Sequence, residues 1–176
     1  MDAVNIEIKA RCGNLAVIRN ILHDKEARYI GCDHQQDTYY YVPSGRLKLR
    51  QGTIENALIY YERQDIQGPK QSDVKLYKSK SSDDLKDLLN AFLGVQIVVN
   101  KIREIYFIDN VKFHLDKVEH LGDFVEIEAI DETGLLTVKE LQHQCDHYLR
   151  LFEIKDDDLV PQSYSDLIII VVKPPK

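Results

Sequence analysis

Residues 45–50, with the sequence GRLKLR, combine charge and spacing in a way that could serve chemistry. Cations and leucines alternate with a period of two, which is the pattern of a β-strand with two unlike faces. Arg46, Lys48 and Arg50 then share one face, and Leu47 and Leu49 share the other. Three like charges on one face repel one another and need solvent or an anionic partner. For this strand alone, a solvent-exposed face is the simpler interpretation.

Other stretches repeat this alternation with charges of both signs. Glu7 and Lys9 alternate with Ile6 and Ile8. The other charged pairs that flank an isoleucine are Lys101 and Arg103, and Glu126 and Glu128. The repetition predicts one shared surface that binds a polyanion together with its metal ions. The alternative is a set of structural ion pairs across a sheet, which remains the better interpretation for any single pair.

The residue types on this surface point to phosphate chemistry. Glutamate carboxylates are hard oxygen ligands, which suit Mg²⁺ or Mn²⁺ better than zinc. Lysine and arginine suit phosphate oxygens, and arginine can bind two of them at once. Phosphoryl and nucleotidyl transfer are catalysed largely by charges placed around a polyanionic transition state. Carboxylates for a metal beside a cradle of cations are the minimum that such a reaction needs.

Length and composition limit the class of protein. The chain has 176 residues with 44% apolar residues, which fits one globular domain spanning 1–176. Its net charge of -6 argues against general affinity for nucleic acid. The three cysteines show no Cys-x-x-Cys spacing and fit reduced thiols. With no signal segment and no apolar run long enough to span a bilayer, we expect a soluble, cytoplasmic protein without a membrane partner.

The periodicity gives nine candidate strand segments, or about eight strands, and three helices. The expected strands cover residues 4–12, 29–34, 37–42, 45–50, 57–64, 73–78, 95–108, 111–118 and 124–129. The expected helices run from Asn14 to about residue 27, from Ser81 or Ser82 to Phe92, and over 135–152, and a segment over 163–172 closes the chain. Short turns between neighbouring strands favour antiparallel pairing, so we predict an α+β fold whose sheet is strongly curved or closed, with helices packed outside.

A closed sheet would have an interior, and the charged strand faces would line it. Unpaired buried charges are very costly, so such an interior cannot be a dry core. The sequence therefore predicts a tunnel filled with water or ligand.

Several motifs also occur together in the order seen in one known family. They are IEIK at residues 6–9, GRLKLR at 45–50, Lys101-x-Arg103 before IYF at 105–107, and GDFVEIE at 122–128. This ordered set resembles the CYTH superfamily, the triphosphate tunnel metalloenzymes, and is most similar to its class IV adenylyl cyclase branch. A late motif, Ser163-Tyr164-x-Asp166-Leu167, is similar to the class IV adenylyl cyclase branch. The likeness covers nearly the whole chain.

The resemblance implies a closed eight-stranded antiparallel β-barrel around a tunnel for a triphosphate and a divalent metal, Mg²⁺ or Mn²⁺. By motif position it implies metal-side acids at Glu7, Glu126 and Glu128, with Asp116 a weaker candidate. Phosphate contacts are implied for Lys9, Lys48, Arg50, Arg63, Lys101 and Arg103, and catalytic roles for Lys9, Arg50 and Arg103.

One position departs from the family signature Glu-x-Glu-x-Lys. This chain has Asn5 where the first glutamate is expected. Asparagine offers one neutral carbonyl oxygen in place of a charged carboxylate. One metal should therefore bind more weakly or through water, and the number of metals stays open.

The resemblance leaves two reactions and one binding role in competition. A class IV cyclase converts ATP to cyclic AMP and pyrophosphate, through in-line attack of the ribose 3′-hydroxyl on the α-phosphorus. An inorganic, thiamine or nucleoside triphosphatase instead directs water at a terminal phosphorus. The third reading is a non-catalytic module that binds nucleotide or polyphosphate. The expected partner is thus a triphosphate-containing small molecule, and the choice between monomer and homodimer stays open.

Overall fold

The computed structural model describes residues 4–62, 70–78, 80, 83–131 and 133–172. Its strands are β1 (Val4–Arg11), β2 (Arg28–Tyr40), β3 (Arg46–Gln51), β4 (Ala57–Glu62), β5 (Lys70–Lys78), β6 (Val95–Ile108), β7 (Val111–Val118) and β8 (Gly122–Asp131). Its helices are α1 (Leu15–Asp24), α2 (Asp83–Leu93), α3 (Val138–Leu151) and α4 (Tyr164–Val172), with one 3₁₀ turn, Asp156–Asp158. The predicted α+β class is confirmed.

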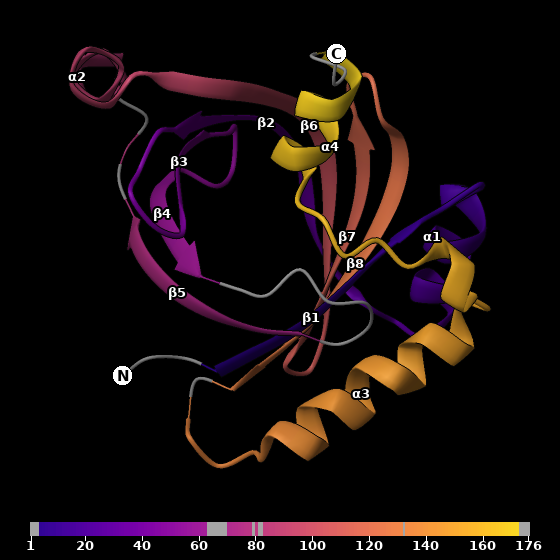
Figure 1. The fold of residues 1–176 in the computed structure, drawn as a ribbon. Coiled ribbons are helices and arrows are strands. Elements are labelled where there is room, and N and C mark those ends of the chain that lie inside the picture. The colour runs from indigo at the N-terminus through magenta and orange to yellow at the C-terminus, as the bar shows by residue number, and fades with distance from the viewer. Residues whose placement is uncertain (1–3, 63–69, 79, 81–82, 132, 173–176) are drawn as a thin grey trace.

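The eight strands form one strongly curled antiparallel sheet (Figure 1). They are hydrogen-bonded in the order β1-β5-β4-β3-β2-β6-β7-β8, and β8 pairs again with β1. The β1–β8 contact involves eight residue pairs, whereas the β1–β5 contact involves three, from Asn5–Ser72 to Glu7–Lys70. Full closure of the sheet therefore depends on this one short contact between β1 and β5.

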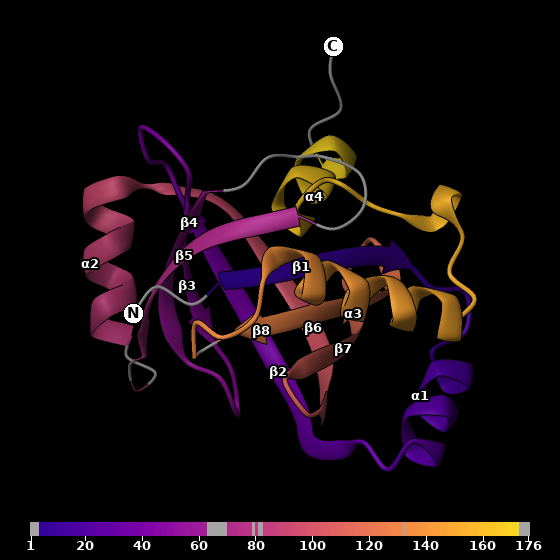
Figure 2. The same ribbon diagram turned by 90° about the horizontal axis from the view of Figure 1, so that it is seen from below.

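The main hydrophobic core lies outside the curl, between the sheet and helices α1 and α3 (Figure 2). Ile6 and Ile8 of β1 pack there, together with Leu22 of α1 and Leu141 of α3. Period-two alternation then turns the charged residues of the same strands toward the concave side. This inversion, with apolar residues outward and charges inward, is what creates a charged interior.

Local signals explain where the helices begin and end. The side chain of Asn14 accepts a hydrogen bond from the Ala16 amide and caps α1, as predicted. Thr137 and Glu140 form a capping box at the start of α3. Gly94, with φ of 75°, follows α2 in the left-handed conformation that favours glycine. These contacts fix the helix ends to within a few residues of the expected positions.

Two expectations about the elements are wrong. Residues 29–34 and 37–42 do not form two strands, because β2 runs unbroken along the long strand β6 from Arg28 to Tyr40. Three helices were expected, but the closing segment, which the sequence left unassigned, forms a fourth helix, α4.

Helix α2 packs outside the sheet as expected, but only loosely, with Lys86 donating to Gln36 of β2. None of its residues is buried, and the side chains of Leu88 and Phe92 are 66% and 84% exposed. Ser81 and Ser82, its expected caps, lie outside the described residues.

Helix α4 lies at one end of the curl, beside β6 (Figure 1). Tyr164 and Ile168 join a second hydrophobic cluster that includes Tyr39, Val99 and Phe124. The cysteines Cys12, Cys32 and Cys145 are free thiols, as expected. None of the helices in the described part of the chain has the length and apolar character needed to cross a bilayer.

Candidate active site

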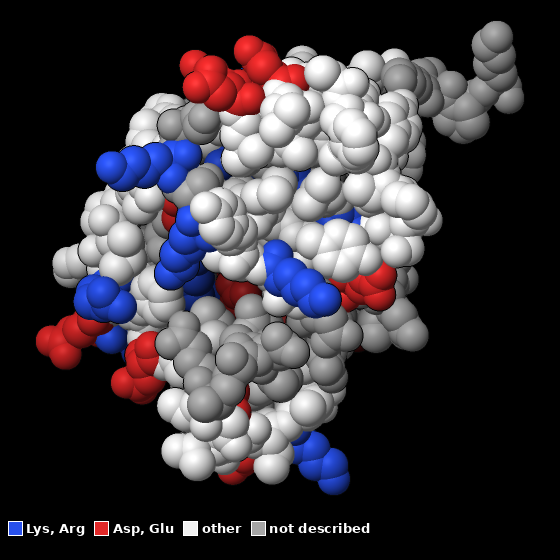
Figure 3. Space-filling model, turned by 90° about the vertical axis from the view of Figure 1, so that its left-hand side faces the viewer, with Lys and Arg blue, Asp and Glu red and all other residues white. Residues whose placement is uncertain are grey.

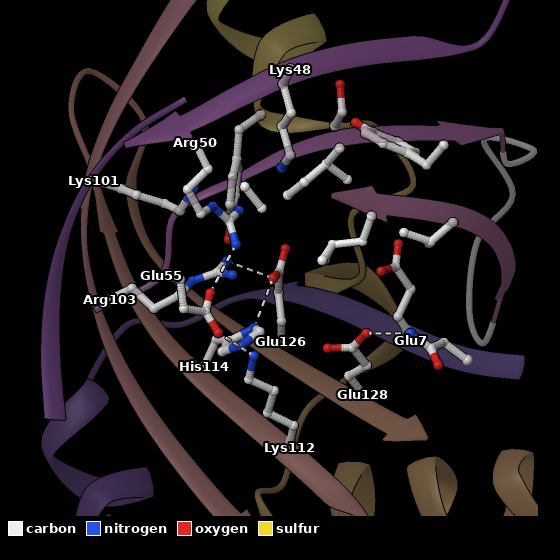
Figure 4. A pocket seen from close by; sticks show the side chains of 18 of the residues that line it. Glu7, Lys48, Arg50, Glu55, Lys101, Arg103, Lys112, His114, Glu126 and Glu128 are labelled. Atoms are coloured by element: carbon white, nitrogen blue, oxygen red, sulfur yellow. Dashed lines mark hydrogen bonds and ion pairs between the residues drawn. The ribbon is translucent and has the colours of Figure 1, made fainter. Parts of the chain in front are cut away.

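A cavity of about 550 Å³ lies on the concave side of the sheet. Glu7, Arg50, Arg103 and Glu126, from four different strands, all line it, which confirms the predicted convergence of the charged strand faces (Figure 4). Figure 3 shows lysine and arginine side chains around a hollow on one face, with acidic side chains visible inside it. The interior is therefore a polar, accessible site.

Asp37 of β2 is the anion that holds several of these cations together. Its carboxylate is buried and accepts hydrogen bonds from Lys48 (3.0 Å), from Arg50 (2.9 and 3.0 Å) and from Lys101 (2.8 Å). Burial alone would raise the pKa of Asp37, but Arg50, Lys101 and Lys48 outweigh it and hold that pKa well below its ordinary value. Asp37 thus stays ionised and positions three cations at the wall of the cavity.

Sequence reasoning did not identify Asp37 as part of the site. Asp33, Gln35 and Asp37 are all buried and occupy alternate positions of β2. This period-two spacing of polar residues was the signal that could have revealed their shared face.

Arg103 of β6 is held by two carboxylates. Asp116 accepts from its Nε at 2.7 Å and from its Nη2 at 2.5 Å, and Glu126 accepts from Nη2 at 2.7 Å. The hydroxyl of Tyr164, on α4, donates to Asp116 at 2.7 Å. Asp116 is fully buried behind Arg103 and does not line the cavity. Its hydrogen bonds therefore hold the Arg103 guanidinium group in a fixed orientation.

Glu126 of β8 connects the cations to an acidic part of the cavity. Besides Arg103, it lies 3.3 Å from Lys9 Nζ and 3.2 Å from His114 Nδ1. Burial would raise the pKa of Glu126, but Arg103 and Lys9 keep it well below the ordinary value. Glu126 is thus a carboxylate with strong cationic neighbours.

Glu7 and Glu128 lie on the other side of the cavity from the Asp37 cluster (Figure 4). Burial raises the pKa of Glu128 to about 7; Lys112 opposes the shift, while the charges of Glu7 and Glu126 add to it. Asn5 donates to Glu128 Oε1 at 2.8 Å, and its own Oδ1 is buried without a hydrogen-bond partner.

These observations fit a divalent cation. A hard metal ion would offset the repulsion between the crowded carboxylates and would give the unpartnered carbonyl oxygen of Asn5 a ligand contact. As they stand, no three acidic, histidine or cysteine side chains within the described ranges are grouped closely enough to hold a metal. Mg²⁺ is usually held by one or two carboxylates together with substrate phosphates, so a complete protein cage is not required.

Three charged or titratable residues at the centre of the cavity, Glu55, Lys112 and His114, were among those not proposed as site residues from the sequence. Lys112 and His114 alternate on β7, and Glu55 comes from the turn between β3 and β4. Burial lowers the pKa of His114 to about 4, with Arg103 and Lys112 adding to the shift, so its imidazole is neutral near pH 7. The period-two spacing of Lys112 and His114 could have indicated that both face the interior. Glu55 lies in a turn, where no such periodicity indicates which way a side chain points.

Apart from Lys78 of β5, the cavity wall formed by β4 and β5 is largely apolar, in contrast to the rest. Ile59, Tyr61, Val74 and Leu76 contribute this side. Lys48 Nζ lies 5.7 Å from the centre of the Tyr61 ring, within cation–π range. The cavity can thus contact phosphate on one side and an uncharged group on the other.

The predicted site residues are mostly gathered in one place. Those that line the cavity are Glu7, Lys9, Lys48, Arg50, Lys101, Arg103, Glu126 and Glu128. Asp116 lies behind Arg103, and Arg63 lies outside the described residues.

Comparison with known proteins places the chain in a family. The family model described as the CYTH domain matches residues 3–164, and the protein belongs to this family. A comparison with curated proteins finds no match.

Solved structures share the fold over almost the whole chain. The PH1012 protein of Pyrococcus horikoshii is 27% identical, with a TM-score of 0.79 over 93% of this chain and 98% of that one. A protein of Vibrio parahaemolyticus named a putative adenylate cyclase is 21% identical, with a TM-score of 0.76 over 96% and 99% of the two chains. The Hippeastrum protein HpAC1, named a putative adenylyl cyclase with a dominant triphosphatase activity, is 12% identical, with a TM-score of 0.61 over 98% and 97%.

Proposed function

We propose that this protein is a divalent-metal-dependent enzyme that acts on triphosphates. The observation that carries the proposal is one cavity in which a cluster of lysines and arginines adjoins the carboxylates of Glu7, Glu126 and Glu128. Such a pairing of cations and acids suits a polyanion that arrives with metal ions. Membership of the CYTH family supports the same conclusion.

The charge balance of the cavity favours a metal-bound substrate. Lining cations are Lys9, Lys48, Arg50, Lys78, Lys101, Arg103 and Lys112, and lining acids are Glu7, Glu55, Glu126 and Glu128. Asp37 and Asp116 add two buried negative charges directly behind them. Because these charges nearly cancel, the described residues alone do not offset a triphosphate.

Glu126 and Glu128, with Glu7, are the residues proposed to hold the ion, which when bound would offset charge on the phosphate oxygens. Lys9, Lys48, Arg50, Lys101 and Arg103 are proposed to contact the phosphates. Arg63 remains a candidate for the same role. Asp116 is better suited to orienting Arg103 than to binding metal, because Arg103 and Tyr164 already occupy its oxygens.

A bound triphosphate would also bear on the shape of the sheet. We propose that β1 and β5 close the curl into a complete tunnel when ligand is present, since their contact is the short one. Glu7 lies at the end of this contact and on the cavity wall, so ligand binding and closure share a residue.

The favoured reaction is that of a class IV adenylyl cyclase. The apolar wall formed by Ile59, Tyr61, Val74 and Leu76 supports it. An apolar surface of this kind can pack against the base and sugar of a nucleoside, whereas inorganic triphosphate has no apolar group to place there. In this reaction the ribose 3′-hydroxyl attacks the α-phosphorus in line and pyrophosphate leaves. Arg50 and Arg103 would stabilise the charge that develops on the phosphate oxygens.

Hydrolysis of the triphosphate is the second candidate. Lys48 lies within cation–π range of both Tyr39 and Tyr61, which competes with stacking of a base on these rings. The same cations and acids would then act on a terminal phosphate, with water as the nucleophile.

Product analysis separates these reactions. The protein is incubated with ATP and, separately, with inorganic triphosphate, each with Mg²⁺ or Mn²⁺, and every product is resolved. Cyclic AMP with pyrophosphate supports the cyclase. Orthophosphate without cyclic nucleotide, formed fastest from inorganic triphosphate, replaces it with a triphosphatase. If neither compound gives any product, the enzymatic role is contradicted and the binding module is the interpretation that remains.

A further inference from the structure

Glu55 places a negative charge inside the cationic part of the cavity (Figure 4). Its Oε2 accepts from Arg50 Nη1 at 3.0 Å, and its Oε1 accepts from Lys112 Nζ at 2.6 Å. Arg50 is on β3 and Lys112 on β7, and these strands are separated in the sheet by β2 and β6. The Arg50–Glu55–Lys112 contact, here called the crossbar, therefore spans the interior.

The backbone that carries Glu55 is fixed by Asp33. The buried carboxylate of Asp33 accepts from the amides of Ile54 (2.8 Å) and Glu55 (2.9 Å), and from the Thr53 hydroxyl (3.0 Å). Gly52 is required for this fit, because a Cβ there would lie 2.6 Å from Asp33 Oδ1 and from the Glu55 carbonyl oxygen. The turn thus holds Glu55 in place with little freedom.

Glu55 also remains charged in this position. Burial would raise the pKa of its carboxyl, but Lys112 and Arg50 hold it well below the ordinary value. A phosphate chain bound along β3 would contact the cations Lys48 and Arg50 first. Further along, toward the turn after β3, it would approach the fixed carboxylate of Glu55. Phosphate groups beyond Arg50 would face repulsion in a partly desolvated site.

We propose that Glu55 limits the number of phosphate groups that the cavity accepts, so that the protein selects triphosphates over longer linear polyphosphates. This inference rests on the proposed triphosphate function. Selection arises because the crossbar occupies Lys112 and one nitrogen of Arg50, and because its carboxylate repels a fourth phosphate group. Gln35 Nε2, 3.2 Å from Glu55 Oε2, adds a neutral contact that keeps the carboxylate in place.

Binding of linear polyphosphates to the full chain provides the test. Calorimetric titration with pyrophosphate, tripolyphosphate and tetrapolyphosphate, without metal and with Ca²⁺, gives the dissociation constants. For the wild type we expect tripolyphosphate to bind about tenfold more tightly than tetrapolyphosphate. The variant Glu55→Gln keeps the shape of the side chain and removes its charge. In this variant the preference for tripolyphosphate over tetrapolyphosphate should fall to between about onefold and threefold.

Glu104→Gln is the control, because it also removes one negative charge but lies outside the cavity, where Glu104 pairs with Arg19 of α1. It should keep the wild-type ratio. An equal change of ratio in Glu104→Gln would overturn the proposal, because net charge and not the position of Glu55 would then set selectivity. So would a Glu55→Gln variant that tightens all chain lengths equally.

A second variant keeps the test decisive if Glu55→Gln folds poorly. Glu55→Ser removes both charge and bulk, and thermal unfolding of each variant identifies the folded ones. Wild-type protein that binds tripolyphosphate and tetrapolyphosphate equally well contradicts the length limit alone. Wild-type protein that binds no polyphosphate contradicts the triphosphate function itself.

Discussion

Arg103 and Asp116 are directly opposite each other on β6 and β7 and are joined by two hydrogen bonds of 2.7 and 2.5 Å. This two-pronged contact fixes the plane of the guanidinium group, and Tyr164 fixes Asp116 from α4. A bidentate donor whose plane is fixed can bind phosphate oxygens with little loss of conformational freedom.

Arg103→Lys keeps the positive charge but removes the fork. We expect a loss of transition-state stabilisation on the order of 1.5–3 kcal/mol, which lowers kcat/KM roughly 10- to 160-fold, because one charge-assisted contact to the phosphates is lost. Steady-state kinetics on the triphosphate that the enzyme turns over would measure this. A variant with wild-type kinetics would show that Arg103 is purely structural.

Glu126→Gln keeps the size of the side chain and removes its charge. Metal-dependent turnover should collapse, because the proposed metal loses a carboxylate, while the far-ultraviolet circular dichroism stays that of a folded protein. Glu104→Gln is the control, since it breaks an ion pair with Arg19 on the outer face of the sheet. Unchanged dependence of activity on metal concentration in Glu126→Gln would remove Glu126 from the metal site.

Asn5→Glu restores the acid found in the family signature. A further carboxylate beside Glu128 and Glu7 should lower the thermal unfolding midpoint without metal, because like charges are crowded. It should also tighten Mn²⁺ binding, so that added Mn²⁺ raises the midpoint more than in the wild type. Calorimetry that shows no tighter Mn²⁺ binding would mean that the missing carboxylate is not what limits the site.

Lys101 links stability to pH. Burial lowers its pKa to about 7; the charge of Asp37 opposes the shift, and those of Arg50, Arg103 and Lys48 add to it. The ordinary lysine pKa is about 10.4, so between pH 7 and about 10 the unfolded chain binds more protons at this group than the folded protein. The contribution of Lys101 to stability should therefore rise with pH across that window.

Lys101→Met isolates this effect. From pH 7 to 9, the free energy of unfolding of the wild type should rise relative to that of the variant by about 2 kcal/mol. Urea denaturation at the two pH values measures the difference. A constant difference would mean that Lys101 does not titrate in this range.

Period-two alternation predicted much of the site because several of the charged strands have apolar neighbours that are buried, although Ile102, between Lys101 and Arg103, is exposed. Ile6 and Ile8 must pack under α3 and α1, so Glu7 and Lys9 must face inward. The same logic placed Lys48, Arg50 and Glu126. Asp37 was missed because its strand is polar on the inner face and was divided into two predicted strands.

Tertiary packing decided what local sequence could not. The apolar run at 164–172 has no clear period, so its helical state depends on packing against the cluster around Phe124 and Val99. Glu55 reaches the cavity only because Asp33, twenty-two residues earlier in the chain, binds its turn. No spacing rule relates these two positions.

The most direct test of the charged cavity as a triphosphate site is a crystal structure of the protein with Mn²⁺ and tripolyphosphate. We predict that the phosphates lie inside the sheet against Arg50 and Arg103, with anomalous manganese signal beside Glu126 and Glu128. Ligand found only on the outer surface, with these four side chains still paired as they are without ligand, would contradict the proposed site.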